Sequence, residues 1–532
     1  MANRPTGGND DEKPVRQAVV VVHGMGSQEP GQTLFGFVKT ALSPVPGDRP
    51  WRYYSRPAEI TQSYEARRCI APQLNGTPPP QEHTEIFEYH WSYLMTGNRF
   101  GDLVPTTARL LLRRRAGVPD GLYGAWRLLW WILAGVVLLV LILLALVLLL
   151  VPDNVTKVIG AVLTSGVVVG AATLGVGWVG NKVASSFVDV TRYLDKSPRS
   201  YSARRAIRGG LVDLLQRIHD EGYDRIVVVA HSLGGYIAYD ALTSLWAQMH
   251  GLNAGAVPDP PRPGDPALAG LEDLEQHCDV LLAPLRARES AGDASTTASL
   301  PFAADADDTG TRPDVVEYQR LQFELWKGLR RQGNPWRVTD FLTVGTPMTF
   351  ADLLMTTAKW RDGFGKPDGR KASCSMFGDM TRRGDLVRCP PRGETRTVED
   401  VREPAHVHYG RSRAPGLQVL GSQSVFGPVR WTNVWFPVVR GSVRGDWFGG
   451  PLRPLFGPGI RDIRIDGNLD RRLTPALAHT YYFTFENDNS EGSIARTVRD
   501  TLALRDSYDS LVELRQSALP TDPSTGGPVI ES

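Results

Sequence analysis

The chain has 532 residues, with 59 Lys and Arg against 57 Asp and Glu, so its formal net charge is only +2. This balance argues against nucleic acid as a partner, because nucleic-acid-binding domains carry a clear basic excess. The four cysteines are scattered without a CxxC pair, which is typical of a reducing compartment and predicts no metal site. We also expect no cofactor, because the sequence has no glycine-rich phosphate loop and no HExxH motif.

The N-terminal region combines a polar tail with a first strand. Residues 1–17 are polar and carry no apolar signal-peptide core, so we expect them to be disordered. Residues 18–22 form an apolar run of strand length that ends in the loop His23-Gly24-Met25-Gly26. The two glycines allow the backbone to turn sharply around Met25, and we interpret His23 as a residue that holds this loop by hydrogen bonds.

Two uncharged runs interrupt the globular sequence. Residues 128–151 are 24 apolar residues, with Trp130 and Trp131 near one end as interfacial anchors. At ~1.5 Å per residue a helix of this length spans ~36 Å, enough for a hydrocarbon core of ~30 Å. Residues 158–180 are uncharged but richer in glycine and contain a GxxxG pattern, which allows close helix approach. Residues 127–180 therefore predict a transmembrane hairpin, with a short turn between its two helices.

A hairpin returns the chain to the side that it left, so residues 18–126 and 181–250 can belong to one domain on one side of the bilayer. Basic residues gather outside both runs: Arg113, Arg114, Arg115, Arg127, Lys182, Arg192, Lys196, Arg199, Arg204 and Arg205. The positive-inside rule then predicts an integral membrane protein whose globular domain lies on the cytoplasmic side.

The motif with the clearest chemistry lies in residues 225–235, RIVVVAHSLGG. Four β-branched residues predict a buried strand that runs into a tight turn, and residues 236–246 read as the following helix. Ser232 lies in that turn between small residues: Ala230, Gly234 and Gly235. The pattern is the nucleophile elbow G-x-S-x-G with alanine at the first glycine, and here the chain resembles the serine esterases and lipases of the α/β-hydrolase superfamily.

The resemblance covers roughly residues 18–95, 190–250 and 317–485, and it implies a mainly parallel sheet covered by helices on both faces. Apolar runs that fit such strands lie near residues 18–22, 85–90, 225–230, 338–344, 431–438 and 462–466. Helical patterns separate several of these runs, including an amphipathic one at 314–332.

The resemblance also implies roles for individual residues. Ser232 would be the nucleophile, and the backbone N–H groups of Met25 and Leu233 would form the oxyanion hole, supported by the loop and elbow glycines Gly24, Gly26, Gly234 and Gly235. The family order Ser, acid, His excludes the histidines before Ser232, and His250 and His277 lie in or beside the insertion, so His406, His408 and His479 are the candidate bases. We favour His479, which is followed by aromatic residues, and interpret His231 as a structural residue.

The acid should lie in the segment after the strand at 431–439. Asp446 is the only carboxylate in residues 440–452, and we favour it as the acid that orients His479. Asp462 and Asp466 are alternatives, and Asp385 would serve if His406 or His408 were the base.

Other parts of the chain carry weaker signals. Residues 251–313 read as a flexible insertion before a third part of the domain at 314–514, and residues 355–430 read as a cap-like excursion within that part. The polar C-terminal residues 515–532 are expected to be disordered.

Together these features predict a membrane-anchored serine hydrolase that cleaves carboxylic esters through a Ser-His-Asp triad and an acyl-enzyme. The anchor favours lipid-like acyl esters as substrates and the bilayer as a partner. An acyl-protein or acyl-carrier thioesterase would use the same machinery, and a catalytically silent membrane scaffold or sensor is an alternative of another class. The oligomeric state stays open.

Overall fold

The computed structural model describes most of the residues that the sequence assigns to strands and to the elbow. The described residues are 15–25, 29–41, 54–57, 67–72, 83–95, parts of 123–145, 190–194 without 191, 198–249, parts of 273–283, 312–331, 334–351, 386–391, 423–438, 445–466, 477–483, 492–504 and 506–517.

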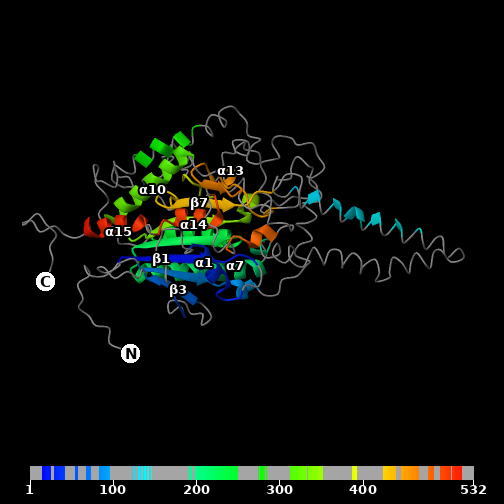
Figure 1. Ribbon diagram of the computed structural model, residues 1–532, viewed down its shortest axis with the longest axis horizontal. Coiled ribbons are helices and arrows are strands. Elements are labelled where there is room, and N and C mark those ends of the chain that lie inside the picture. Colours follow the sequence, from blue (N-terminus) through cyan, green and yellow to red (C-terminus); the bar gives the residue numbers. More distant parts are fainter. Residues whose placement is uncertain are drawn as a thin grey trace, which may run out of the picture.

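A single eight-stranded sheet lies at the centre of the described fold (Figure 1). Its spatial order is β2-β3-β4-β1-β5-β6-β7-β8, and the pairings from β4 to β8 are all parallel. Only the pairs of β3 with β2 and with β4 are antiparallel. The strands are β1 (Arg16–Val22), β2 (Tyr54–Pro57), β3 (Arg67–Pro72), β4 (His83–Tyr89), β5 (Arg225–His231), β6 (Val338–Val344), β7 (Arg430–Trp435) and β8 (Arg461–Arg464).

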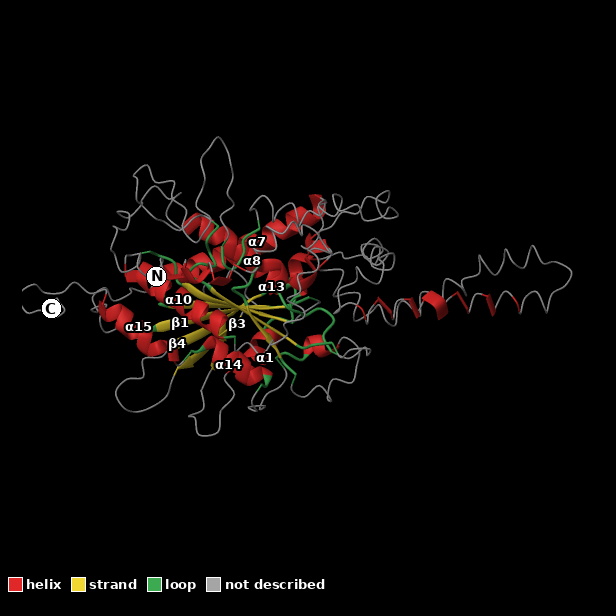
Figure 2. Cartoon of the chain, turned by 90° about the horizontal axis from the view of Figure 1, so that it is seen from above, coloured by secondary structure: helices red, strands yellow, loops and turns green. Residues whose placement is uncertain are grey.

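Helices cover both faces of this sheet, with α7 and α8 on one side and α1 and α14 on the other (Figure 2). The described α-helices are α1 (Gln32–Ala41), α7 (Pro198–Asp220), α8 (Gly234–Met249), α10 (Pro313–Arg331), α13 (Arg453–Phe456), α14 (Ile494–Leu502) and α15 (Asp506–Ser517). Short 3₁₀ turns occur at η2 (Ser92–Met95), η7 (Pro347–Phe350) and η10 (Leu477–Thr480).

Alternation along the strands builds a separate core on each face. Val20 and Val228 pack with α7, α8 and α10, whereas Val19 and Val227 pack with α1 and α14. Because both faces of the central strands are buried, their sequences read as continuous apolar runs instead of alternating ones.

The prediction of a mainly parallel sheet with helices between its strands is confirmed, and each of the six expected strands is present with ends shifted by at most a few residues. The sequence did not reveal β2 and β3. Both strands are short and carry arginine and proline, so no long apolar run marks them, and in the edge strand β2 these residues also hinder pairing with other chains.

Described structure extends into both segments that the sequence predicts to be disordered, 1–17 and 515–532. The first strand already begins at Arg16, and the buried Gln17 side chain donates to the Leu504 carbonyl over 2.7 Å. At the other end, α15 continues to Ser517 because Leu511 and Leu514 pack into the core beside α10.

The first apolar run is helical at every described position between 123 and 145, and this helix extends away from the sheet (Figure 1). Its large apolar side chains are exposed: Trp131 to 70% and Leu138 to 58%. Among the residues that the structure describes, no helix has the length and apolar character needed to cross a bilayer. The second run, at 158–180, the insertion at 251–313 and the excursion at 355–430 lie largely or wholly outside the described residues.

Candidate active site

The turn after β5 holds Ser232 in a strained conformation. Its φ is +56°, the left-handed region that few residues other than glycine adopt. The Ser232 N–H donates to the Val344 carbonyl of β6 over 3.0 Å, which fixes the turn to the sheet. Such strain persists where the surrounding structure imposes it, and it often marks a functional position. This is the geometry that the elbow motif predicts.

Three glycines allow the backbone to pack closely around this turn. A Cβ on Gly24 would lie 2.8 Å from the Ser232 Cβ, and one on Gly234 would lie 2.5 Å from the Val22 carbonyl oxygen. A Cβ on Gly235 would overlap the side chain of Thr346. The small residues of the motif are therefore required by the contact between the elbow and the β1 and β6 strand ends.

Residues from three distant segments meet at Ser232. His479, in the 3₁₀ turn η10, places Nε2 2.7 Å from Ser232 Oγ. Its Nδ1 lies 3.0 Å and 3.2 Å from the two carboxylate oxygens of Asp446. An imidazole with its proton on Nδ1 donates to Asp446 and accepts the Ser232 hydroxyl proton at Nε2. The structure thus brings together the three residues that sequence reasoning favoured.

The Asp446 carboxylate is fully buried and densely hydrogen-bonded. The Phe448 N–H donates to Oδ1 over 2.8 Å, and the Tyr482 hydroxyl donates to Oδ2 over 2.6 Å. Burial acts to raise the Asp446 pKa, but the His479 ring and these donors outweigh burial, so the pKa is lowered overall. Asp446 is therefore held as a carboxylate that can stabilise a protonated imidazole.

The base is held from its backbone as well. His231 Nε2 lies 3.0 Å from the His479 carbonyl oxygen, and the Phe448 ring packs 4.7 Å from the His479 ring. Burial lowers the His231 pKa to about 3, so His231 stays neutral and donates to that carbonyl. His231 acts here as a positioning residue, in line with the structural role expected from the sequence.

The loop after β1 contributes one candidate oxyanion donor, Met25, and the turn after β5 contributes the other, Leu233. Met25 is 7% exposed and Leu233 is fully buried. His23 anchors the loop, because its Nε2 accepts the Trp91 N–H over 3.1 Å and its carbonyl accepts the Trp91 indole N–H over 3.0 Å. Burial lowers the His23 pKa to about 3, so this histidine is a neutral structural group. Gly26 lies outside the described residues.

The alternative acids on β8 and just beyond it have other partners. Asp462 accepts hydrogen bonds from the backbone of Leu452 and Arg453 and pairs with the Arg453 guanidinium, so it secures the segment that follows Asp446. Asp466 is exposed and pairs with Arg464. The remaining alternatives, His406, His408 and Asp385, lie outside the described residues.

Sequence reasoning missed Tyr482, which is the second side chain on the Asp446 carboxylate. Its hydroxyl also accepts the Phe436 N–H over 2.9 Å, and its ring stacks on Phe436 at 4.2 Å. The aromatic pair that follows His479 in the sequence was the available signal. By resemblance to the family this pair indicates the base, whereas in the structure one of the two aromatic residues contacts the acid.

No arrangement of three or more His, Cys, Asp or Glu side chains suited to a metal occurs within the described ranges. Comparison of the chain with protein-family models, with curated proteins and with solved structures gave no match.

Proposed function

We propose that this protein is a serine hydrolase of carboxylic esters, anchored to a membrane, with the α/β-hydrolase fold. The contact chain Ser232 to His479 to Asp446, built on a serine with positive φ, is the observation that carries the proposal. Each link serves nucleophilic acyl transfer, because a serine hydroxyl needs a base and the base needs an orienting acid.

The proposed reaction passes through an acyl-enzyme. Ser232 Oγ attacks the acyl carbon while its proton moves to His479 Nε2, and the N–H groups of Met25 and Leu233 receive the oxyanion. The C–O bond to the alcohol then breaks, and the alcohol oxygen takes the proton from His479. Water attacks the acyl-enzyme with His479 again as base, which releases the acid and restores the Ser232 hydroxyl. Asp446 stabilises the imidazolium in both halves of the cycle.

A catalytically silent scaffold is the second candidate, because the Ser232 side chain has no exposed surface. A substrate carbonyl must reach Oγ, so an active enzyme has to open around this residue. A scaffold would keep the same contacts and never open.

Membrane anchoring rests on the apolar surface of the helix between 123 and 145. Exposed apolar side chains on one projecting helix form a patch that water disfavours and that hydrocarbon accepts. Described members of this patch are Trp130, Trp131, Leu133, Val137, Leu138, Leu141 and Ile142. We propose that residues 127–180 enter the bilayer as a hairpin and that the catalytic domain lies on the cytoplasmic side.

Labelling with a fluorophosphonate probe tests the reaction class. Detergent-solubilised wild type should react, whereas Ser232→Ala and His479→Ala should not, because the probe needs an activated serine. Ser244→Ala, on the same helix α8, is the matched control and should label like wild type. A folded wild type that does not label would reject the hydrolase in favour of the scaffold.

Alkaline carbonate extraction tests the anchor. Wild type should stay in the membrane pellet, and a Leu138→Lys/Leu141→Lys variant should move to the supernatant, because each charge at a bilayer centre costs about 3 kcal/mol. Val316→Lys alters an exposed apolar residue on α10 and should stay in the pellet. Extraction of wild type would refute the anchor, and protease protection of the catalytic domain in sealed inside-out vesicles would refute its cytoplasmic side.

A further inference from the structure

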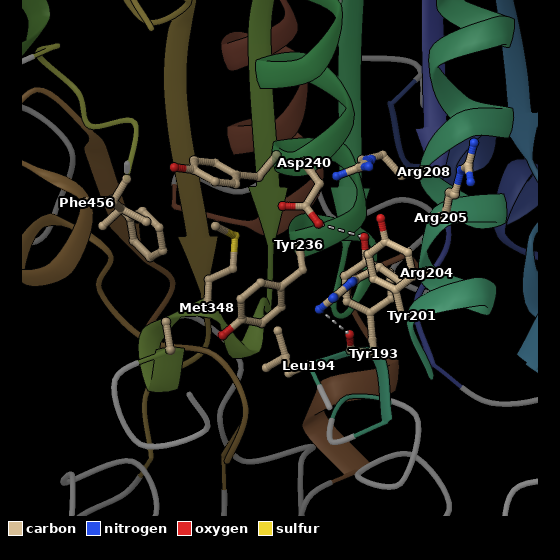
Figure 3. A pocket seen from close by; sticks show the side chains of 13 residues that line it. Tyr193, Leu194, Tyr201, Arg204, Arg205, Arg208, Tyr236, Asp240, Met348 and Phe456 are labelled. Atoms are coloured by element: carbon tan, nitrogen blue, oxygen red, sulfur yellow. Dashed lines mark hydrogen bonds between the residues drawn. The ribbon is translucent and has the colours of Figure 1, made fainter. Parts of the chain in front are cut away.

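A cavity of about 210 Å³ is lined by side chains of α7 and α8 and by residues near the turn η7 and the helix α13 (Figure 3). Thirteen residues line it: Tyr193, Leu194, Tyr201, Arg204, Arg205, Arg208, Tyr236, Tyr239, Asp240, Met348, Ala351, Leu386 and Phe456. The lining divides into an apolar wall and a wall of arginines, and the catalytic contacts described above use none of these side chains.

The apolar wall is continuous with the elbow. Tyr236 is only four residues after Ser232 and lies in the first turn of α8. Met348 lines the cavity and also packs at the elbow, because its sulfur would lie 3.4 Å from a Cβ on Gly235. The Tyr236 hydroxyl donates to the Pro347 carbonyl over 3.4 Å, which ties α8 to the turn η7 after β6. A small molecule in this cavity therefore lies next to the nucleophile turn.

The opposite wall is strongly cationic. Arg204, Arg205 and Arg208 follow one another on one side of α7, and Tyr201 lies a turn earlier at the rim. Arg204 donates to the Tyr193 carbonyl over 3.3 Å and lies over the Tyr201 ring at 5.7 Å. Within the described part of the chain, Arg205 and Arg208 make neither a hydrogen bond nor an ion pair. Two guanidinium groups are thus left with their donors available.

The single carboxylate in the cavity lining does not balance this charge. Tyr193 donates its hydroxyl proton to Asp240 Oδ2 over 2.9 Å (Figure 3). Burial raises the Asp240 pKa, while the Tyr193 hydrogen bond and the charges of Arg208 and Arg204 act in the opposite direction. Two arginines, Arg208 and Arg204, therefore act on one carboxyl group that already has a partner, and the positive excess lies beside apolar walls that weaken solvent screening.

We propose that this cavity is a subsite for the phosphate of a phosphate-bearing acyl ester, with Arg205 and Arg208 as its anion ligands. The inference rests on the proposed function, and it names the substrate class of the same site. Planar guanidinium groups match phosphate oxygens in bidentate geometry, which sets phosphate apart from a neutral glycerol hydroxyl. The volume suits a phosphate with a short polyol, and the acyl carbonyl then extends toward Ser232 past Tyr236 and Met348.

A binding measurement tests the subsite without any turnover. Ser232→Ala protein in detergent is heated with glycerol 3-phosphate or with glycerol, and its melting temperature is recorded. Glycerol 3-phosphate should raise the melting temperature, and glycerol should not. The added pair Arg205→Gln/Arg208→Gln should abolish the rise, whereas Arg217→Gln, an exposed arginine farther along α7, should preserve it. An equal rise in the double variant would overturn the proposal.

Kinetics on soluble short esters tests the link to catalysis. Wild type should cleave monobutyrylglycerol 3-phosphate with a kcat/KM at least about tenfold above that for monobutyrylglycerol, since a bidentate pairing of arginine with phosphate is worth a factor of this size. The double variant should lose this preference through KM and keep its kcat/KM on the neutral ester. An unchanged preference in the double variant would overturn the subsite.

A vesicle arm separates the two sources of the phosphate. Palmitoylglycerol 3-phosphate in neutral phosphatidylcholine vesicles should be the better substrate if the natural source is a membrane lipid, and the soluble ester if it is a free metabolite. A phosphate preference seen only in vesicles would overturn the subsite and assign the arginines to the membrane surface. If no ester is cleaved at all, the proposed function fails, while the melting experiment still decides the anion site.

Discussion

The two ends of strands β5 and β6 carry buried charged clusters that differ in one respect. At the beginning of the strands, the Arg225 guanidinium donates to Asp340, Gln17, Thr339 and the Leu502 carbonyl. At the end of the same strands, Asp446 holds His479, and His479 reaches Ser232 at 2.7 Å. Both clusters are removed from water.

The difference lies in what each cluster leaves unused. At the first end, Asp340 binds both Arg225 and Arg430, and their charges outweigh burial and lower its pKa. The charged groups Arg225, Asp340 and Arg430 pair with one another, so we expect this cluster only to hold the strands together. At the second end, the chain of contacts ends at a strained serine hydroxyl whose proton can move. Burial alone therefore does not indicate a functional site, whereas a buried hydrogen-bond network that ends at a reactive hydroxyl group does.

Removal of the serine hydroxyl should give the largest effect. Ser232→Ala should lower kcat on an ester by about 10⁶-fold, the loss typical of a triad nucleophile, and leave the melting temperature within a few degrees of wild type. Steady-state kinetics checks the loss of kcat, and thermal unfolding in detergent checks the melting temperature. A variant that retains more than a hundredth of wild-type kcat would contradict the assignment of Ser232 as nucleophile.

Loss of the charge on Asp446 should give the second-largest effect. Asp446→Asn keeps the shape of the side chain but lets it donate to His479 Nδ1, which favours the wrong tautomer and should lower kcat about 10⁴-fold. Asp466→Asn, outside the triad, is the matched control and should keep wild-type kcat. Equal activity of the two variants would remove Asp446 from the triad.

Loss of the carboxylate in the cluster of Arg225, Asp340 and Arg430 should change the stability of the protein and not its activity. Asp340→Asn leaves Arg225 and Arg430 without a counter-charge and should cost about 3–5 kcal/mol of unfolding free energy. Glu317→Gln breaks an exposed pair with Arg320 and should cost less than about 1 kcal/mol. Denaturant titration of both variants checks this, and an Asp340→Asn protein as stable as wild type would show that the cluster does not hold the strands.

The sequence predicted the central strands well because β1, β5 and β6 are buried on both faces, and only continuous apolar runs satisfy that environment. It also favoured Ser232, His479 and Asp446, since the elbow glycines and the chain order limit the choices. The local pattern did not reveal β2 and β3, which are short and carry arginine and proline in place of an apolar run.

Tyr482 and the arginine cavity were missed for a different reason. The contact of Tyr482 with Asp446 joins two loops 36 positions apart, and Arg205 and Arg208 meet Tyr236 only because α7 packs on α8. No residue pattern within one segment of the sequence indicates such long-range contacts. The sequence marks Arg204 and Arg205 only as basic flanks of a membrane run, and it does not single out Arg208.

A smaller effect should follow from removal of the second donor on the acid. Tyr482→Phe takes away a hydrogen bond to the Asp446 carboxylate and should lower kcat between about tenfold and about 150-fold, since hydrogen bonds to charged groups are worth about 1.5–3 kcal/mol. The decisive readout is the pH profile, in which the acidic limb should move to higher pH, because an Asp446 carboxylate with one donor fewer stabilises the protonated imidazole more strongly. Tyr481→Phe is the neighbouring control. A profile identical to wild type would reduce Tyr482 to a packing residue.

The last prediction contrasts Asp340 with Glu88, a buried carboxyl at the end of β4. Glu88 accepts the Gly31 N–H at 2.5 Å, near the start of α1 and the loop that carries Met25. Burial raises its pKa from 4.5 to about 7, against the opposing effect of backbone donors. Because the folded state holds this proton more tightly than the unfolded state, the stabilisation is complete below pH 4.5 and is lost as the pH rises through 7.

Glu88→Gln removes this titration while it keeps an oxygen that accepts the Gly31 N–H. The melting temperature of wild type relative to Glu88→Gln should therefore fall by several degrees between pH 4.5 and 7 and then stay level. Asp340, whose pKa is lowered, should show no such fall in this range when wild type is compared with Asp340→Asn. Parallel melting curves of wild type and Glu88→Gln across this range would mean that Glu88 is already ionised in the folded protein. Asp340, which pairs with two arginines, and Glu88, which accepts a backbone N–H, would then differ in their hydrogen-bond partners and not in their protonation.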